Sequence, residues 1–264
     1  MRVAYAVEGD GPVVVLVHSS ASGRRQWRTL TAALADRFRV AALDLVGYGD
    51  MPAWSRSGAQ RLAEQSKLVH GVIEELGEPI ALVGHSFGAT VALDAAAGLG
   101  ERLPGLVLIE PNPFSLLRDD GRPEWADAAA LRDAVKAAAG SGDLAPAAER
   151  FADYWNGAGT WAALGDERRA ALARALEPNV HEWDSVMDAD GDTVSAVRAA
   201  TLVVTARDTV ATIAAIAAVL ARLRPDWRFA QVDGGGHMAP LTRPDLVDPI
   251  VASFLDGLAR GSTP

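Results

Sequence analysis

Residues 80–93 read IALVGHSFGATVAL, an apolar run that a histidine and a serine interrupt between two glycines. The part before the glycines has the composition of a buried strand, and the part after them that of a helix. Gly84 to Gly88 fit G-x-S-x-G, a pattern in which serine lies at the sharp turn between strand and helix. Glycine has no Cβ, so the two elements can cross closely there. The stretch therefore predicts Ser86 to be a nucleophile held clear of the core; the alternative is a serine that only caps the helix.

Apolar runs of the same kind recur along the chain and alternate with helical patterns. The runs occupy residues 13–20, 38–49, 79–86, 103–111, 201–208 and 227–237. Apolar residues with helical spacing occupy 24–36, 58–76, 87–98 and 245–258. Such alternation predicts an α/β fold with a mostly parallel sheet and helices on both faces. Residues 3–12 predict a further strand or hairpin at the edge of that sheet.

Residues 112–198 break this alternation, because they hold helical patterns and no good strand. We expect a helical insertion there, between core segments 1–111 and 199–264. Aromatic residues gather in the insertion; they are Trp125, Phe151, Tyr154, Trp155, Trp161 and Trp183. They either form the wall of an apolar pocket or bury the faces of short helices. Phe114, at the start of the insertion, is also expected near the pocket.

The composition limits the classes of partner. The chain has 264 residues, 49% of them hydrophobic, which suffices for one sizeable core. Its net charge of −9 argues against partners with many phosphates, such as nucleic acids and anionic membranes. It has no cysteine, and its N-terminus lacks the pattern of a signal peptide. We therefore expect a cytoplasmic protein with a small-molecule substrate, either monomeric or homodimeric.

A serine nucleophile needs a base, and the base needs a carboxylate that orients it. Of the five histidines, His237 follows the last predicted strand in the glycine-rich loop GGGHMAPLTRP and is the predicted base. Asp208, at the end of TLVVTARD, is the leading candidate for the acid, because the order Ser, Asp, His is typical of this motif. Glu110, at the end of LVLIE, is its rival. Asp44 is expected to fix a loop.

The tetrahedral intermediate of acyl transfer needs two amide donors for its oxyanion. The amide of Phe87, directly after the nucleophile, is the first candidate. The second is the amide of Ser20, with Ser19 as the alternative, in the turn after VVVLVH. That turn could also be a polar turn without a catalytic part.

Together these segments resemble the α/β-hydrolase superfamily in its compact form with a helical cap. The similar segments are, in order, VVVLVHSS, LDLVGYGD, VGHSFGATVAL, VVTARD and GGGHMAPLTRP. The resemblance implies an eight-stranded, mostly parallel sheet, a Ser-His-acid triad, and a cap inserted after the sixth strand. Haloalkane dehalogenases and epoxide hydrolases of this fold use an aspartate nucleophile. The serine at position 86 therefore argues against both activities.

Three positions depart from the superfamily's pattern. The oxyanion turn is usually His-Gly, whereas here it is His18-Ser19. The usual glycine three residues before the acid is Thr205, and the proline often found after the acid is missing. The last two departures keep Glu110 open as the acid, since some relatives place the acid after the sixth strand.

The sequence thus predicts a serine hydrolase that cleaves a small, apolar carboxylic ester, lactone or thioester through an acyl-enzyme. We expect no metal or organic cofactor, because the histidines show no ligand spacing such as H-E-x-x-H. One alternative uses the same triad for C–C bond hydrolysis, perhydrolysis or a biosynthetic cyclisation. The other is a ligand-binding protein of this fold that turns nothing over.

Overall fold

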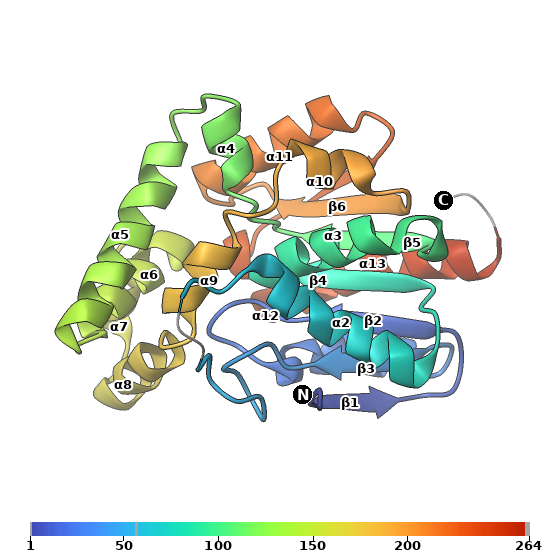
Figure 1. Cartoon of the computed structure of the whole chain (residues 1–264), viewed down its shortest axis with the longest axis horizontal. Helices are drawn as coiled ribbons and strands as arrows, with labels where there is room; N and C mark the ends of the chain where they lie inside the picture. Colours follow the sequence, from blue (N-terminus) through green and yellow to red (C-terminus); the bar gives the residue numbers. More distant parts are fainter. Residues whose placement is uncertain (1, 56–57, 262–264) are drawn as a thin grey trace.

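A seven-stranded sheet lies at the centre of the computed structural model, which describes residues 2–55 and 58–261 (Figure 1). The strands are β1 (Tyr5–Glu8), β2 (Val13–Val17), β3 (Arg39–Leu43), β4 (Ala81–His85), β5 (Gly105–Ile109), β6 (Ala200–Ala206) and β7 (Arg228–Val232). Their order in the sheet is β1-β3-β2-β4-β5-β6-β7. Only the β1–β3 pairing is antiparallel among the described strands, so the predicted mostly parallel sheet is confirmed.

The expected number of eight strands was wrong for the described residues. For residues 3–12 the sequence predicted either a strand or a hairpin, and the structure has a single strand there, β1. Gly9 follows β1 with a φ of 81°, and a Cβ there would lie 2.2 Å from the carbonyl oxygen of Phe38. The chain therefore turns directly after β1 and enters β2.

The central strands are buried along their whole length, which explains their continuous apolar sequences. Every residue of β2, β4 and β5 is buried. Alternate residues of β2 contribute to two separate apolar clusters, Val15 and Val17 to one and Val14 and Leu16 to the other. The sheet is thus covered on both faces, as the sequence predicts for parallel strands.

Helices from different parts of the chain cover these two faces. The cluster with Val15 includes residues of α2 (Leu62–Leu76), α3 (Phe87–Leu99) and α11 (Ala211–Leu223). The cluster with Val14 includes residues of α1 (Arg28–Leu34), which follows the short helix η1 (Arg24–Trp27), and of α13 (Pro244–Ala259). Figure 1 shows α2 and α3 in front of the sheet and α13 behind it. None of the helices within the described residues combines the length and the hydrophobicity needed to cross a bilayer.

A helical insertion separates β5 from β6. It comprises α4 (Ser115–Asp119), α5 (Trp125–Ser141), α6 (Ala145–Asn156), α7 (Thr160–Ala163), α8 (Asp166–Ala175), α9 (Asn179–Ser185) and α10 (Gly191–Ala196). Figure 1 shows α5 to α9 at one end of the sheet, beyond the arrowheads of the parallel strands. The insertion thus forms a cap over the carboxyl ends of these strands, where open α/β sheets bind ligands.

The helical insertion lies between the same two core segments as in the predicted division of the chain. Its exact limits, 112 and 198, remain predictions, and residues 1, 56–57 and 262–264 of the predicted core lie outside the described residues.

Candidate active site

Ser86 lies at the sharp turn between β4 and α3. Its backbone has φ 55° and ψ −121°, a conformation that residues other than glycine rarely adopt. The turn requires the two flanking glycines. A Cβ on Gly84 would lie 2.3 Å from the carbonyl oxygen of Gly88, and one on Gly88 would lie 2.3 Å from the carbonyl oxygens of Val17 and His18. The first glycine lets α3 cross β4, and the second lets α3 approach the end of β2.

The structure brings Ser86, His237 and Glu110 together. His237 Nε2 lies 2.8 Å from Ser86 Oγ, and His237 Nδ1 lies 3.2 Å from Glu110 Oε2. His237 belongs to the short helix η3 (Gly236–Met238), which follows β7, and the preceding Gly235 has a φ of 97°. All three side chains are buried, with exposed fractions of 4%, 3% and 0%. The proton of a serine hydroxyl can therefore pass to a neutral imidazole whose second nitrogen faces a carboxylate.

Glu110, and not Asp208, is the carboxylate that contacts His237. Asp208 is exposed, and its Oδ1 accepts a hydrogen bond from the amide of Gly236 at 3.0 Å. Glu110 follows β5, the direct neighbour of the strand that carries Ser86, whereas Asp208 lies in the turn after β6, one strand farther away. The expectation that Asp208 orients His237 is thus not met, and Asp208 instead supports the backbone of the loop that carries this histidine.

The Glu110 carboxylate is held firmly by further groups. Its Oε1 accepts a hydrogen bond of 2.6 Å from the amide of Ala206, and its Oε2 accepts one from the hydroxyl of Thr209. The backbone of Glu110 has a φ of 49°, which is uncommon for a residue with a Cβ. Backbone strain of this kind persists only where the surroundings fix it, and it often marks functional positions.

Burial shifts both titrating partners toward their neutral forms. It lowers the pKa of His237 to about 3 and raises that of Glu110 to about 7, although the hydrogen bonds from Thr209 and Ala206 oppose the second shift. At and above neutral pH the imidazole is therefore unprotonated, as a base must be, and Glu110 is available as an anion for the imidazolium that forms transiently.

The candidate oxyanion donors lie beside Ser86. Phe87 is the first residue of α3, so its amide belongs to the N–H groups that a helix leaves without an intrahelical acceptor. The amide of Ser19, the alternative donor, donates instead to Gln26 Oε1 at 3.1 Å. Ser20 lines the same cavity as Ser86 and His237. The amides of Phe87 and Ser20 remain the predicted pair.

A chain of hydrogen bonds connects the oxyanion turn with the loop of the base. Gln26 Oε1 accepts from the amide and hydroxyl of Ser19, and its Nε2 lies 3.1 Å from His85 Nδ1. His85 Nε2 lies 2.8 Å from the carbonyl oxygen of His237. Since a carbonyl only accepts, Nε2 of His85 carries the proton, and its Nδ1 accepts from Gln26. Burial lowers the pKa of His85 to about 3, which favours this neutral form.

The other predicted loop residues have structural roles. His18 is fully buried, and its Nε2 accepts from the amide of Leu45 at 3.0 Å. Asp44 accepts hydrogen bonds from the amides of Arg24 and Asp50, and so fixes its loop as expected.

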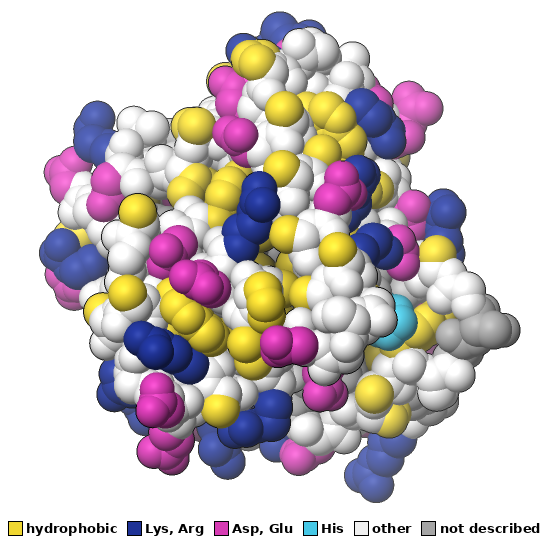
Figure 2. Space-filling model, turned by 90° about the vertical axis from the view of Figure 1, so that its left-hand side faces the viewer, with side chains coloured by type: hydrophobic (Ala, Val, Ile, Leu, Met, Phe, Trp, Pro, Cys, Tyr) yellow, Lys and Arg dark blue, Asp and Glu magenta, His cyan; other side chains and the backbone are white. Residues whose placement is uncertain are grey.

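The cap supplies an aromatic wall to the site. Trp155, at the end of α6, stacks on His237 with ring centroids 4.0 Å apart. Both line a cavity of about 110 Å³ that also contains Ser86 and Phe151. Figure 2 shows the cap side of the molecule, where apolar and charged side chains are interspersed over the surface. The sequence left two interpretations of the aromatic residues in the insertion, and Trp155 and Phe151 agree with the first, the wall of a pocket.

The remaining aromatic residues of the cap differ in their roles. Trp183 and Phe114 stack on each other at 5.4 Å and line a second, smaller cavity beside Phe87. Trp125 and Trp161 instead contact arginine side chains. The spacing of these aromatic residues in the sequence does not distinguish those that line a cavity from those that contact arginines. Nor does the sequence indicate that Gln26 contacts the oxyanion turn.

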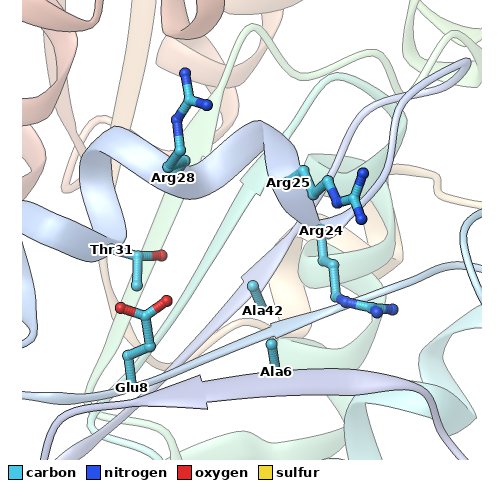
Figure 3. A pocket seen from close by; sticks show the side chains of 7 residues that line it. All are labelled: Ala6, Glu8, Arg24, Arg25, Arg28, Thr31 and Ala42. Atoms are coloured by element: carbon cyan, nitrogen blue, oxygen red, sulfur yellow. The ribbon is translucent and has the colours of Figure 1, made fainter.

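A larger cavity of about 510 Å³ has a lining different from that of the Ser86 site. Its lining comes from β1, β3, η1 and α1, and includes Glu8, Arg24, Arg25 and Arg28 (Figure 3). Figure 3 shows the three arginine side chains pointing in different directions rather than toward one point. Arg24 is paired with Asp44 and Asp50. The groove contains none of the residues of the Ser86 site.

Comparisons with known proteins agree with the fold. Residues 14–249 match the alpha/beta hydrolase family. The chain is 31% identical over 130 residues to a haloalkane dehalogenase of Sphingobium indicum, covering 48% of this chain but only 42% of that protein. It is 28% identical over 268 residues to the lipase LipV of Mycobacterium tuberculosis, covering 93% of this chain and 94% of the lipase.

Solved structures give the same result for the fold. A thermophilic esterase from Thermogutta terrifontis superimposes with a TM-score of 0.76 at 23% identity, covering 97% of this chain and 93% of the esterase. Because the family match spans most of the residues that form the sheet, the cap and the Ser86 site, the chain belongs to the alpha/beta hydrolase family.

Proposed function

We propose that the protein is a serine hydrolase that cleaves small carboxylic esters through an acyl-enzyme on Ser86. The contact that carries this proposal is the 2.8 Å approach of His237 Nε2 to Ser86 Oγ. A serine hydroxyl is a weak nucleophile by itself, and a base at hydrogen-bond distance is the usual means of activating it. Glu110 completes the triad, because it faces Nδ1 of the same imidazole.

The reaction follows from this geometry. Ser86 Oγ attacks the carbonyl carbon while His237 Nε2 takes its proton. The amides of Phe87 and Ser20 bind the oxyanion, and His237 then returns the proton to the departing alcohol oxygen. Water attacks the acyl-enzyme with His237 again as base, which releases the acid and restores Ser86. Glu110 stabilises the imidazolium at each stage.

The size and lining of the cavity favour a small substrate with an apolar part. A volume of about 110 Å³ is below the roughly 300–1,000 Å³ of pockets for drug-sized ligands. Trp155, Phe151 and Leu172 provide apolar surface around Ser86. The lipase and esterase among the similar proteins support ester chemistry. The dehalogenase relative supports it less, because this chain has serine at the nucleophile position.

A fluorophosphonate probe tests the proposal. It reacts with activated serines, so we expect it to label the wild-type protein at Ser86 and to leave Ser86→Ala unlabelled. Hydrolysis of p-nitrophenyl acetate should disappear in the same variant. A folded wild-type protein that is neither labelled nor active would contradict the proposal and would favour a ligand-binding role.

A further inference from the structure

Glu182 is a buried carboxyl group in the cap that the proposed reaction does not use. It lies on α9, and its exposed fraction is 2%. One oxygen, Oε2, accepts a hydrogen bond of 2.7 Å from Asn179 Nδ2. The other oxygen, Oε1, is buried and has no hydrogen-bond partner within the described part of the chain.

No described cation compensates this carboxyl group. The groups that act on it are the Asn179 amide and the hydroxyls of Ser20 and Tyr48, and none is a lysine or arginine. Burial raises the pKa of Glu182 to about 7 despite these groups. The buried Tyr48 hydroxyl interacts with this carboxyl group and with the backbone of Ala21. A buried polar atom without a well-formed hydrogen bond costs about 1–3 kcal/mol, so a further donor would stabilise Oε1, which has no such bond within the described part of the chain.

The carboxyl group lines a niche next to the site of Ser86. The niche has a volume of about 10 Å³, about the minimum that one water molecule needs. Its walls combine polar and apolar side chains, namely Ser20, Asn112, Asn179 and Glu182 with Phe87, Phe114, Trp183 and Val186. Ser20 also lines the main cavity, and Phe87 directly follows the nucleophile. The niche therefore adjoins the two predicted oxyanion donors.

The residues that line the niche indicate that it lies on the side of the acyl group of a bound ester. His237, which gives the proton to the leaving alcohol, lines the main cavity, whereas the niche is lined by the oxyanion residues. With its carbonyl oxygen on Phe87 and Ser20, an ester has its alcohol toward His237 and its acyl group on the other side. A substituent close to the carbonyl carbon on the acyl chain would point toward Glu182.

We propose that Glu182 is a specificity-determining residue that accepts a hydrogen bond from a hydroxyl or ammonium group on the acyl part of the substrate. This inference rests on the proposed ester hydrolysis at Ser86. The lack of a well-formed hydrogen bond to Oε1 and the lack of a described cation both favour a donor over a further apolar group. An unsubstituted acyl chain would leave Oε1 unpaired, or paired only to a trapped water, and would lose the energy of that bond in the transition state. The preferred substrate is thus a short ester with one apolar part against Trp155 and one donor at Glu182.

Matched pairs of esters test this inference. Methyl butyrate is compared with its 2-hydroxy, 3-hydroxy and 3-amino derivatives, and acid release is followed with a pH indicator. We expect at least one substituted ester to exceed methyl butyrate in kcat/KM by roughly 10–100-fold, the range that one buried hydrogen bond provides. The variant Glu182→Met keeps the length of the side chain and removes its acceptor. It should bring the ratio close to one, mainly by lowering kcat/KM for the substituted ester.

Glu177, an exposed glutamate of the cap that lies just before α9 in the chain, gives the control. Glu177→Met should leave the ratio unchanged. An equal ratio in wild type and in a folded Glu182→Met variant would overturn the inference and leave Glu182 with a structural role. If Glu182→Met does not fold, Glu182→Gln decides, because an amide accepts a hydrogen bond without offering a charge. The preference for the amino ester should then fall, and an unchanged preference would overturn the inference.

Failure of the underlying reaction has a different signature. A wild-type protein that hydrolyses none of the four esters and is not labelled by a fluorophosphonate at Ser86 would overturn both proposals. Labelling of Ser86 with hydrolysis of all four esters at equal rates would overturn the assignment of Glu182 alone.

Discussion

Replacing Glu110 by glutamine should nearly abolish turnover while keeping the shape of the site. The carboxylate faces His237 Nδ1 at 3.2 Å and is fully buried. Glutamine can still accept from the amide of Ala206, but its amide nitrogen would then face His237. The imidazole would turn its acceptor toward that amide and carry its proton on Nε2, where it can no longer take the proton of Ser86.

The loss can be estimated from the distance between the charges. A carboxylate and an imidazolium 3.2 Å apart attract each other by about 5 kcal/mol at an effective dielectric constant of about 20. This attraction exists only while His237 is protonated, which is in the transition states and not in the resting site. Its removal therefore acts on kcat and corresponds to a decrease of about 10³–10⁴-fold.

The assay compares Glu110→Gln with Asp208→Asn, since both carboxylates lie at the ends of neighbouring strands. Initial rates with p-nitrophenyl acetate and rates of fluorophosphonate labelling are measured, with thermal unfolding to verify that both variants fold. We expect Asp208→Asn to lose less than about 10-fold, because its carboxylate holds only the Gly236 amide. The reasoning fails if Asp208→Asn is the crippled variant and Glu110→Gln is nearly as active as the wild type.

Three further predictions follow from the same contacts. Activity should fall as the pH drops through about 7, because protonation of Glu110, whose pKa is raised by burial, removes the anion beside His237. In Glu110→Gln the pH profile of kcat/KM should shift to lower pH, since burial lowers the pKa of His237. A profile of the variant that is not shifted would argue against this assignment. Gly88→Ala should lower the free energy of unfolding by about 3 kcal/mol in urea titrations, because its Cβ would lie 2.3 Å from two carbonyl oxygens. The control Gly98→Ala lies in the same helix, where the nearest atom to a Cβ is 3.7 Å away, and it should fold normally. Gln26→Leu should reduce kcat by roughly 10-fold with little change in KM, because the Ser19 amide and hydroxyl lose their acceptor and the oxyanion turn loses its support; a normal kcat in steady-state measurements would contradict this positioning role.

The class of fold, the candidate nucleophile and the candidate base could be predicted from the amino-acid sequence alone. Each of these depends on local requirements that residue types reveal. Ser86 needs glycine at positions 84 and 88 because β4, α3 and β2 approach within contact there, and no other residue leaves that space. His237 follows three glycines that let the loop turn beside the end of the sheet. The continuous apolar runs predict buried parallel strands because both of their faces are covered.

Which groups meet around these two residues depends on the packing of the folded chain. Glu110 and Asp208 each follow an apolar strand, and the order of residues along the chain favoured Asp208. The sheet separates them, because β5 is the neighbour of β4 and places Glu110 against His237, whereas the turn after β6 leaves Asp208 exposed. Glu182 likewise lies on a cap helix far from Ser86 along the chain. Its approach to the oxyanion residues depends on how the cap packs on the sheet, which is a sum of many long-range contacts that no short stretch of sequence encodes.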